Sequence, residues 1–260
     1  MKHKSHGPHR FFIPPELISG NETRLPNAEA RHLKNVLRIR EGERVEIFDG
    51  TGGNWSGGVE FRRGEVFVCG IEKTPSLHQP TTRLALAMAM IKPARFEWAL
   101  EKATELGVDE IIPLYTARGE IRISGEKISG RLTRWDRIVK ESSKQCRRAD
   151  IPRVRSPLEF HDFLTSEDYP VKNKILFYEK SDNKWLPGRV ETAGGTIICI
   201  GPEGGWTEDE IEFAEKTGYG VFSLGPRILR AETAAIAAIS VFQLTRIFHA
   251  DPETGEEASL

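Results

Sequence analysis

Several short apolar runs without hydrophobic–polar alternation constrain the fold of this chain most strongly. Ile197-Ile-Cys-Ile200 is the clearest of them, and a strand of this kind has to be covered on both faces, as in a parallel sheet. Helical segments separate these runs along the sequence. The expected strands span Arg83–Met90, Val108–Leu114, Lys174–Tyr178, Thr196–Ile200 and Gly220–Leu224, and the expected helices span Pro93–Leu106, Ser129–Arg147 and Glu232–His249. The pattern predicts an α/β domain over residues 82–250.

The first 74 residues show a different pattern, with short alternating strands and tight turns. The expected elements are the strands Arg44–Phe48, Asn54–Phe61 and Glu65–Ile71, and a helix from Asn27 to Arg38 with Asn27 as its N-cap and Leu33, Val36 and Leu37 on one face. They predict a small β-barrel domain over residues 1–74. Pro75 and Pro80 favour a linker over residues 75–81, and residues 251–260 form an acidic tail.

The composition excludes several classes of protein. Hydrophobic residues make up 38% of the chain and charged residues 29%, as in ordinary soluble globular proteins. No apolar run reaches the roughly 20 residues that a membrane-spanning helix needs, and the N-terminus lacks the apolar core of a secretory signal. Three scattered cysteines suit neither a disulfide scaffold nor a CxxC metal site. We therefore expect a cytoplasmic protein that binds no metal and no membrane.

Charge is distributed unevenly, although the formal net charge is only −1. Basic residues outnumber acidic ones between Arg118 and Arg155. Such a segment can bind phosphates, and it can equally be the solvated face of a helix. Charge alone leaves both interpretations open.

A glycine-rich loop follows one of the expected buried strands. The strand ends at Ile200, Gly201-Pro-Glu-Gly-Gly205 turns the chain, and Thr207 with Glu210 has the spacing of a capping box that starts a helix. Glycines let the backbone approach a ligand, and the carboxyl edge of a parallel sheet is where such folds bind ligands. A tight turn without a ligand explains the same residues, so both interpretations stand.

A second loop follows the strand that ends near Leu224. Ile228 and Leu229 are apolar residues in a segment where polar ones are usual, and they suit the walls of an adenine pocket or a local plug of the core. The chain lacks a Walker Gly-Lys-Ser/Thr ending, a GxGxxG fingerprint, a GxSxG elbow and an HExxH helix. Without these motifs, the remaining possibility is a ligand that has no polyphosphate and is held by backbone groups and apolar contacts. S-adenosylmethionine fits that description.

These loops resemble those of the bacterial 16S rRNA uracil-N3 methyltransferases of the SPOUT superfamily. The resemblance rests on Gly201–Gly205, Leu224–Ala234, Lys92–Glu97, Lys102–Val108, Gln145–Arg148, Arg10–Ile13 and His32–Arg38, and covers nearly the whole chain in order. The chain departs from the family pattern at Trp206-Thr207 and at Cys146, and it has a His-rich N-terminal extension. The resemblance implies a trefoil-knotted methyltransferase domain, an N-terminal PUA-like barrel that helps to hold RNA, and a homodimer packed through the knot.

The resemblance also implies site residues. The expected S-adenosylmethionine contacts are Phe177, Glu179, Ile200, Gly201, Glu203, Gly204, Gly205, Leu224, Gly225, Arg227, Ile228, Leu229, Arg230 and Thr233. Cations that could stabilise negative charge on the uracil are Arg230, Arg10 and Arg38, and expected RNA contacts are Arg10, Arg38, Gln145, Arg147 and Arg148. Glu179 and Glu203 could also be ordinary loop carboxylates, an exposed arginine is often only solvated, and no residue stands out as the catalytic base.

The expected function is S-adenosylmethionine-dependent methylation of uracil N3 in the 16S rRNA of the small ribosomal subunit. N3 lies on the Watson–Crick edge, so a paired uridine has to be unpaired or flipped first. Two alternatives remain at this stage. One is a ribose 2′-O-methyltransferase acting on rRNA or tRNA, and the other is a ribosome assembly factor without catalytic activity.

Overall fold

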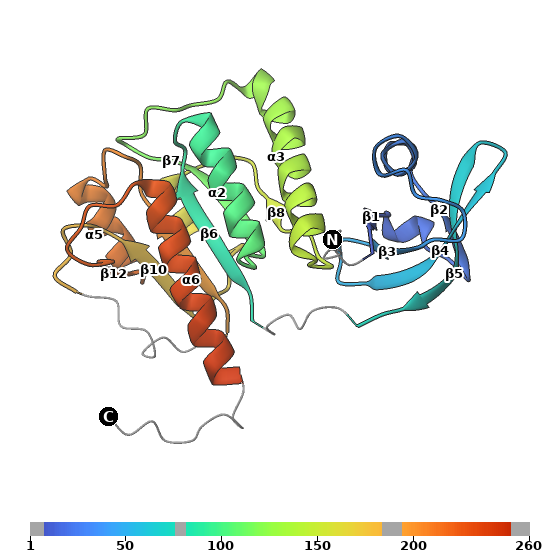
Figure 1. Ribbon diagram of the computed structural model, residues 1–260. Helices are drawn as coiled ribbons and strands as arrows, with labels where there is room; N and C mark the ends of the chain where they lie inside the picture. Colours follow the sequence, from blue (N-terminus) through green and yellow to red (C-terminus); the bar gives the residue numbers. More distant parts are fainter. Residues whose placement is uncertain (1–7, 76–81, 184–193, 251–260) are drawn as a thin grey trace, which may run out of the picture. The chain divides into compact units, whose positions relative to one another are not determined.

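The structure, a computed structural model, describes residues 8–75, 82–183 and 194–250, with side chains to residue 245. The chain divides into two compact units (Figure 1). The first unit comprises residues 1–79 and 143–151, and the second comprises residues 80–142 and 152–260. Residues 143–151 therefore cluster with the N-terminal residues, although the sequence pattern placed them in the α/β domain. Most of the expected linker and the acidic tail lie outside the described residues.

The first unit is built on a five-stranded sheet in the order β1-β3-β4-β5-β2. Its strands are β1 (Arg10–Phe12), β2 (Glu22–Arg24), β3 (Arg44–Phe48), β4 (Asn54–Arg62) and β5 (Glu65–Lys73). β1 pairs with β3 in parallel, and the other pairs are antiparallel. Arg63 and Gly64 both have positive φ (48° and 87°), as a two-residue hairpin turn between right-twisted strands requires. The three strands expected from alternation are present, whereas the short β1 and β2 gave no such signal.

The helix of the first unit differs from the expectation. It begins as α1 (Asn27–Arg31), continues as a π-helical segment η2 (His32–Leu37), and ends at Arg38 in the left-handed conformation (φ 54°). Leu33 is fully buried, but Val36 is 65% exposed, so its predicted place on the apolar face was wrong. A π-turn winds more residues into each turn than an α-helix does, which shifts the side chains that follow it around the axis. The N-cap is Pro26, and Asn27 is already helical.

Arg10 joins the strands of the first unit to residues 143–151. Its guanidinium is buried, donates hydrogen bonds to the Arg148 carbonyl (2.8 Å) and to Asn54 Oδ1 (2.9 Å), and lies 4.3 Å from the centre of the Phe48 ring. Burial lowers the pKa of Arg10 below its ordinary value. A buried cation has to keep its partners because solvation is lost. The placement therefore supports a structural role more than the expected contact with RNA.

The second unit contains a seven-stranded sheet whose strand pairs are all parallel. The order is β12-β10-β11-β6-β7-β8, with β9 also paired to β7. The bounds are β6 (Leu84–Ala89), β7 (Glu110–Tyr115), β8 (Arg153–Val154), β9 (Leu158–Glu159), β10 (Asn173–Phe177), β11 (Thr196–Ile200) and β12 (Gly220–Phe222). All five residues of β11 are buried, as its unbroken apolar sequence predicted.

Helices cover both faces of this sheet. They are α2 (Pro93–Glu105), α3 (Gly125–Cys146), α4 (Phe160–Thr165), α5 (Glu208–Lys216) and α6 (Ala231–Ala250). α4 and α5 supply Phe160, Phe163 and Ala214 to a core cluster with Ala87 and Cys199 of the sheet. α2 and α6 lie side by side across the opposite face (Figure 1), and α6 packs on β11. The α/β class is thus confirmed, while the short α4 was not expected.

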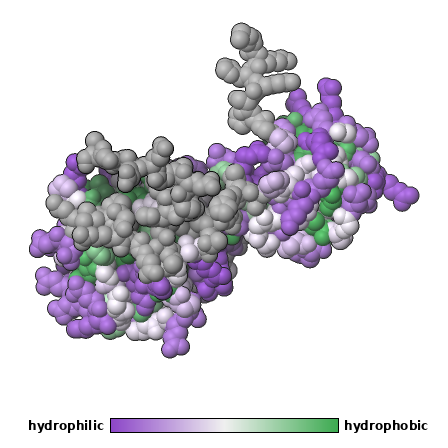
Figure 2. Space-filling model, turned by 90° about the horizontal axis from the view of Figure 1, so that it is seen from below, coloured by the Kyte–Doolittle hydropathy of each residue, from purple (hydrophilic) through white to green (hydrophobic). Residues whose placement is uncertain are grey.

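On the face shown in Figure 2, apolar side chains appear in small areas between polar ones, as is usual for a protein surface in contact with water. No helix in the described ranges is long and apolar enough to cross a membrane. The three cysteines are free, and burial raises the pKa of the Cys199 thiol, which keeps it protonated.

Candidate functional site

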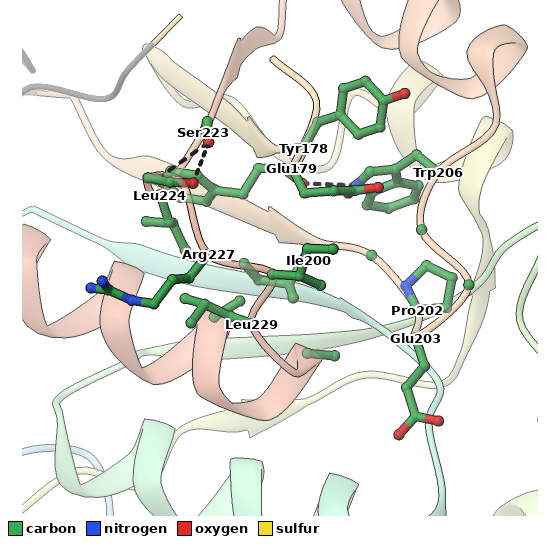
Figure 3. A pocket seen from close by; sticks show the side chains of 18 residues that line it. Tyr178, Glu179, Ile200, Pro202, Glu203, Trp206, Ser223, Leu224, Arg227 and Leu229 are labelled. Atoms are coloured by element: carbon green, nitrogen blue, oxygen red, sulfur yellow. Dashed lines mark hydrogen bonds between the residues drawn. The ribbon is translucent and has the colours of Figure 1, made fainter. Parts of the chain in front are cut away.

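A pocket in the second unit is formed where three neighbouring strands end. β10, β11 and β12 are parallel, so the segments that follow them all leave at the same edge of the sheet. The lining residues are Phe177, Tyr178, Glu179, Ile200, Gly201, Pro202, Glu203, Gly204, Gly205, Trp206, Ser223, Leu224, Gly225, Arg227, Ile228, Leu229, Ala231 and Ala234. Tyr178 and Trp206 lie at one end, Leu224 and Arg227 lie at the other, and Ile200 and Leu229 lie between them (Figure 3).

Trp206 fixes the glycine-rich loop after β11. Its side chain is 2% exposed, packs against the Phe160 ring at 4.5 Å between centroids, and donates from Nε1 to the Phe177 carbonyl at 3.0 Å (Figure 3). A Cβ atom at Gly201 would lie 2.9 Å from this indole, so only glycine fits there. Gly205 has a φ of 70° and closes a turn by donating to the Pro202 carbonyl (2.9 Å). The glycines therefore serve the backbone shape and the packing of Trp206.

The expected capping box forms at the end of the same loop. Thr207 Oγ1 accepts from the Glu210 amide, and Glu210 Oε2 accepts from the Thr207 amide at 2.9 Å. Glu210 is buried, and its Oε1 accepts from the Ala117 amide at 2.8 Å. Arg118 donates to the carbonyls of Gly204 (3.2 Å) and Trp206 (3.1 Å). The segment after β7 thus holds the glycine-rich loop in place.

The loop after β12 is held by a hydrogen bond from its own backbone to the Ser223 side chain. Ser223 Oγ accepts from the Gly225 amide at 3.2 Å (Figure 3), and Gly225 has a φ of 118°, which favours glycine. Leu229 is half-buried in the wall of the pocket, whereas Ile228 is 87% exposed although it lines the rim. Leu229 is therefore buried enough to serve as a pocket wall or as a plug of the core. Ile228 is too exposed to plug the core.

Charged groups are few in the pocket. Its lining contains the carboxylates Glu179 and Glu203 and one cation, Arg227. Glu203 points away from the other labelled side chains (Figure 3) and pairs with Arg95, whose Nε lies 3.7 Å from Glu232 Oε1. A pocket with so few cations has little to hold a polyphosphate, and its carboxylates suit a ligand that carries positive charge.

Most of the residues expected to contact the cofactor line this pocket. Thr233 and Arg230 are exposed and stand outside its lining. Ala231 and Ala234 line it instead, because residues three apart share one side of the α6 helix. Sequence reasoning placed the cofactor against Phe177–Glu179 and Ile200–Gly205, and it missed Trp206 and Ser223. The spacing of the two alanines could have revealed their shared face, but nothing in the sequence places Trp206 under Gly201.

Three of the residues expected to contact RNA lie close together, since Arg10 donates to the Arg148 carbonyl and both Arg10 and Arg147 pair with Glu46. Arg38 and Gln145 are exposed, whereas Arg148 is buried and pairs with Asp150. Arg147 is exposed, has a φ of 65° and pairs with Glu46. Their contacts with RNA stay predictions. Among the described residues, no group of three or more His, Cys, Asp or Glu side chains could hold a metal ion.

Comparison with known proteins assigns the family. Residues 78–243 match the model of an RNA methyltransferase domain, and residues 25–70 match that of an RNA methyltransferase PUA domain. The chain belongs to this family of RNA methyltransferases. A relative in Mesomycoplasma hyopneumoniae, named ribosomal RNA small subunit methyltransferase E, is 40% identical over 64% of this chain and 71% of its own length.

Two solved structures resemble this RNA methyltransferase over 92% of its length and 98% of theirs. One is a ribosomal RNA small subunit methyltransferase E from Neisseria gonorrhoeae bound to S-adenosyl methionine, with 31% identity and a TM-score of 0.82. The other is a methyltransferase from Legionella pneumophila in complex with the bound cofactor SAM, with 30% identity and a TM-score of 0.80. Together with the PUA match, they confirm the two-part SPOUT-like fold.

Replacing Gly201 with alanine should destabilise the second unit by about 1–3 kcal/mol, because the new methyl group forces the buried Trp206 ring to move. Urea unfolding followed by tryptophan fluorescence measures the loss. Gly130→Ala is the matched control, since a Cβ there meets open space on α3 and raises helix propensity. Equal stability of Gly201→Ala and the unaltered protein would contradict the packing argument.

Proposed function

We propose that this protein methylates N3 of a uridine in the 16S rRNA of the small ribosomal subunit and takes the methyl group from S-adenosylmethionine. The proposal rests on the pocket at the ends of β10, β11 and β12. Its support is the family match together with relatives named for the small-subunit rRNA and solved with this cofactor. The uracil-N3 specificity comes from the resemblance of the loop motifs.

The residues of the pocket fit this cofactor. S-adenosylmethionine has an adenosine, a positive sulfonium, an ammonium and a carboxylate, and it has no phosphate. Ile200, Leu224 and Leu229 provide apolar walls for the adenine, and backbone groups of the glycine-rich loop stay within reach of polar atoms. Glu179 would accept hydrogen bonds from hydroxyl or ammonium groups, since Glu203 already pairs with Arg95.

The bound cofactor would supply an electrophilic methyl group. Uracil N3 carries a proton near neutral pH, and it has to lose this proton to solvent before it can attack the methyl carbon; the carbon–sulfur bond would then break with its electron pair left on sulfur. Loss of the proton places negative charge on the uracil oxygens, and a fixed cation lowers the cost of that charge. We assign this role to Arg230, which is exposed directly beside the residues that line the pocket. The same role for Arg38 stays a prediction. Burial of the Arg10 side chain disfavours this role for Arg10.

We also propose that the protein is a cytoplasmic homodimer with a knotted backbone in the second unit. Support for the dimer comes from apolar side chains on neighbouring elements of that unit. Trp98 on α2 is 45% exposed, Leu244 on α6 is 54% exposed, and Ile228 precedes α6. A second copy would cover them and remove this area from water. The three free cysteines agree with a reducing compartment.

The protein should bind S-adenosylmethionine in calorimetry, and Gly204→Phe should abolish that binding. A Cβ at Gly204 already lies 3.2 Å from Arg118 Cβ, so a larger side chain has to enter the pocket or displace the loop. Gly130→Phe on α3, which faces open space, is the control and should bind as the unaltered protein does. Absence of binding by the unaltered protein would favour an assembly factor without catalytic activity.

Mass spectrometry of 16S rRNA should find one uridine without its N3 methyl group in a strain that lacks this gene. Complementation with the unaltered gene should restore the methyl group, and the Gly204→Phe gene should not. A missing methyl group on a ribose hydroxyl would show that the enzyme is a 2′-O-methyltransferase instead.

Trp98→Glu should convert the dimer to a monomer in sedimentation velocity, because the charge would be buried without a partner in the interface. Leu17→Glu is the control, since Leu17 is similarly exposed (46%) but belongs to the first unit. A monomeric unaltered protein, or a dimer that survives Trp98→Glu, would exclude this interface.

A further inference from the structure

A second cavity lies at the same edge of the sheet in the second unit. It is found where β6 and β7 end, and it is bordered by α2, the first turns of α3 and the segment between β7 and α3. Its lining residues are Met90, Pro93, Phe96, Ile121, Arg122, Ile123, Ser124, Lys127, Arg131 and Trp135. The cavity is comparable in size with the pocket at β10–β12.

The two cavities are neighbours but separate. They share no lining residue. A small depression between them shares Glu203 and Gly204 with the first and Met90 and Ile121 with the second. A chain of linked groups could therefore occupy both cavities at once, with one group in each.

The wall of the second cavity is held in a fixed shape. Tyr115 Oη accepts a hydrogen bond from the Ile123 amide at 3.2 Å, and Arg122 pairs with Glu159 and lies 4.8 Å above the Tyr115 ring. Earlier in the same segment, the Ala117 amide donates to Glu210 of α5, and Arg118 donates to the Gly204 carbonyl of the glycine-rich loop. This segment borders both cavities, and its contacts form it before any ligand arrives, which lowers the entropic cost of binding.

The chemistry of the lining favours a particular class of ligand. The lining is largely apolar, and no carboxylate belongs to it; its apolar residues are Met90, Pro93, Phe96, Ile121, Ile123 and Trp135. Arg131 Nη1 lies 3.6 Å from Glu97 Oε1, whereas the exposed Lys127 ammonium makes no hydrogen bond or ion pair within the described part of the chain. Apolar walls beside uncompensated positive charge suit a flat base joined to a phosphate.

We propose that this cavity binds a nucleotide of the RNA substrate that flanks the uridine to be methylated. The inference rests on the proposed function, because it places the reacting base at the methyl donor. Since the cavities share no residue, the base in the second cavity is a neighbour in the strand. Its phosphate lies at Lys127 and Arg131, and its base contacts Ile121 and Ile123. The enzyme thus selects the sequence or shape around its target as well as the target base.

Two variants test the cavity itself. Ile123→Trp fills it, and Lys127→Glu reverses the charge at its rim. Each should raise the KM for small ribosomal subunits from the gene-deleted strain about tenfold, which is the size expected when one base contact is lost, and should leave the Kd for S-adenosylmethionine within about twofold. Lys127→Glu should also reduce the slope of log K for RNA binding against log salt concentration by about 1, the value for one phosphate contact. Lys127→Arg should restore the slope.

Lys216→Glu is the matched control, because Lys216 is an exposed lysine on α5 outside both cavities. It should leave KM and salt dependence unchanged. Equal KM values for Lys127→Glu, Ile123→Trp and the unaltered enzyme would overturn the inference while the proposed function stands.

Direct binding separates the two proposals. Anisotropy with a fluorescent single-stranded RNA that spans the target uridine requires no turnover. If the unaltered protein binds this RNA but does not methylate small ribosomal subunits from the gene-deleted strain, the proposed reaction fails, and weaker binding by the two variants still supports the cavity. If the variants bind the RNA as the unaltered protein does, the cavity is excluded as a nucleotide site.

Discussion

The parallel pairing of β10 with β11 and β12 governs the candidate site. Because the three strands run in one direction, their following segments emerge together, and residues separated by more than forty positions line one pocket. An antiparallel neighbour would send its following segment to the opposite edge. The helices on both faces of the sheet make this arrangement stable, since strands such as β11 are buried on each side.

Side-chain contacts then give these segments their shape. Trp206 occupies the space under Gly201, Glu210 joins the start of α5 to Ala117, and Arg118 holds two carbonyls of the glycine-rich loop. The cost of ordering a loop is thus met by contacts within the protein, which leaves backbone groups placed for a ligand. Neighbouring strands β6 and β7 extend the same edge, so a second cavity beside the first is a consequence of the same topology.

In the first unit, Arg10 has an equivalent structural importance. It resembled an RNA-binding arginine in sequence, and an arginine is usually found at the surface. Its burial among the Arg148 carbonyl, Asn54 and the Phe48 ring follows from the pairing of β1 with β3, which no local pattern near Arg10 indicates. Val36 is a second case, since the π-helical segment η2 turns it to solvent.

The sequence by itself determined the α/β class of the second unit, the buried character of β11, the capping box at Thr207 and most of the residues around the pocket. The first three properties depend on local periodicity and turn chemistry, which neighbouring residues are enough to reveal, whereas the residues around the pocket came from the resemblance of its loops to a known family. Only the tertiary structure decided that Trp206 lies beneath Gly201, that Ala231 and Ala234 replace Thr233 at the pocket, and that residues 143–151 belong with the first unit. Those features depend on contacts between segments distant in sequence, and the energy of such contacts leaves no periodic trace in the chain.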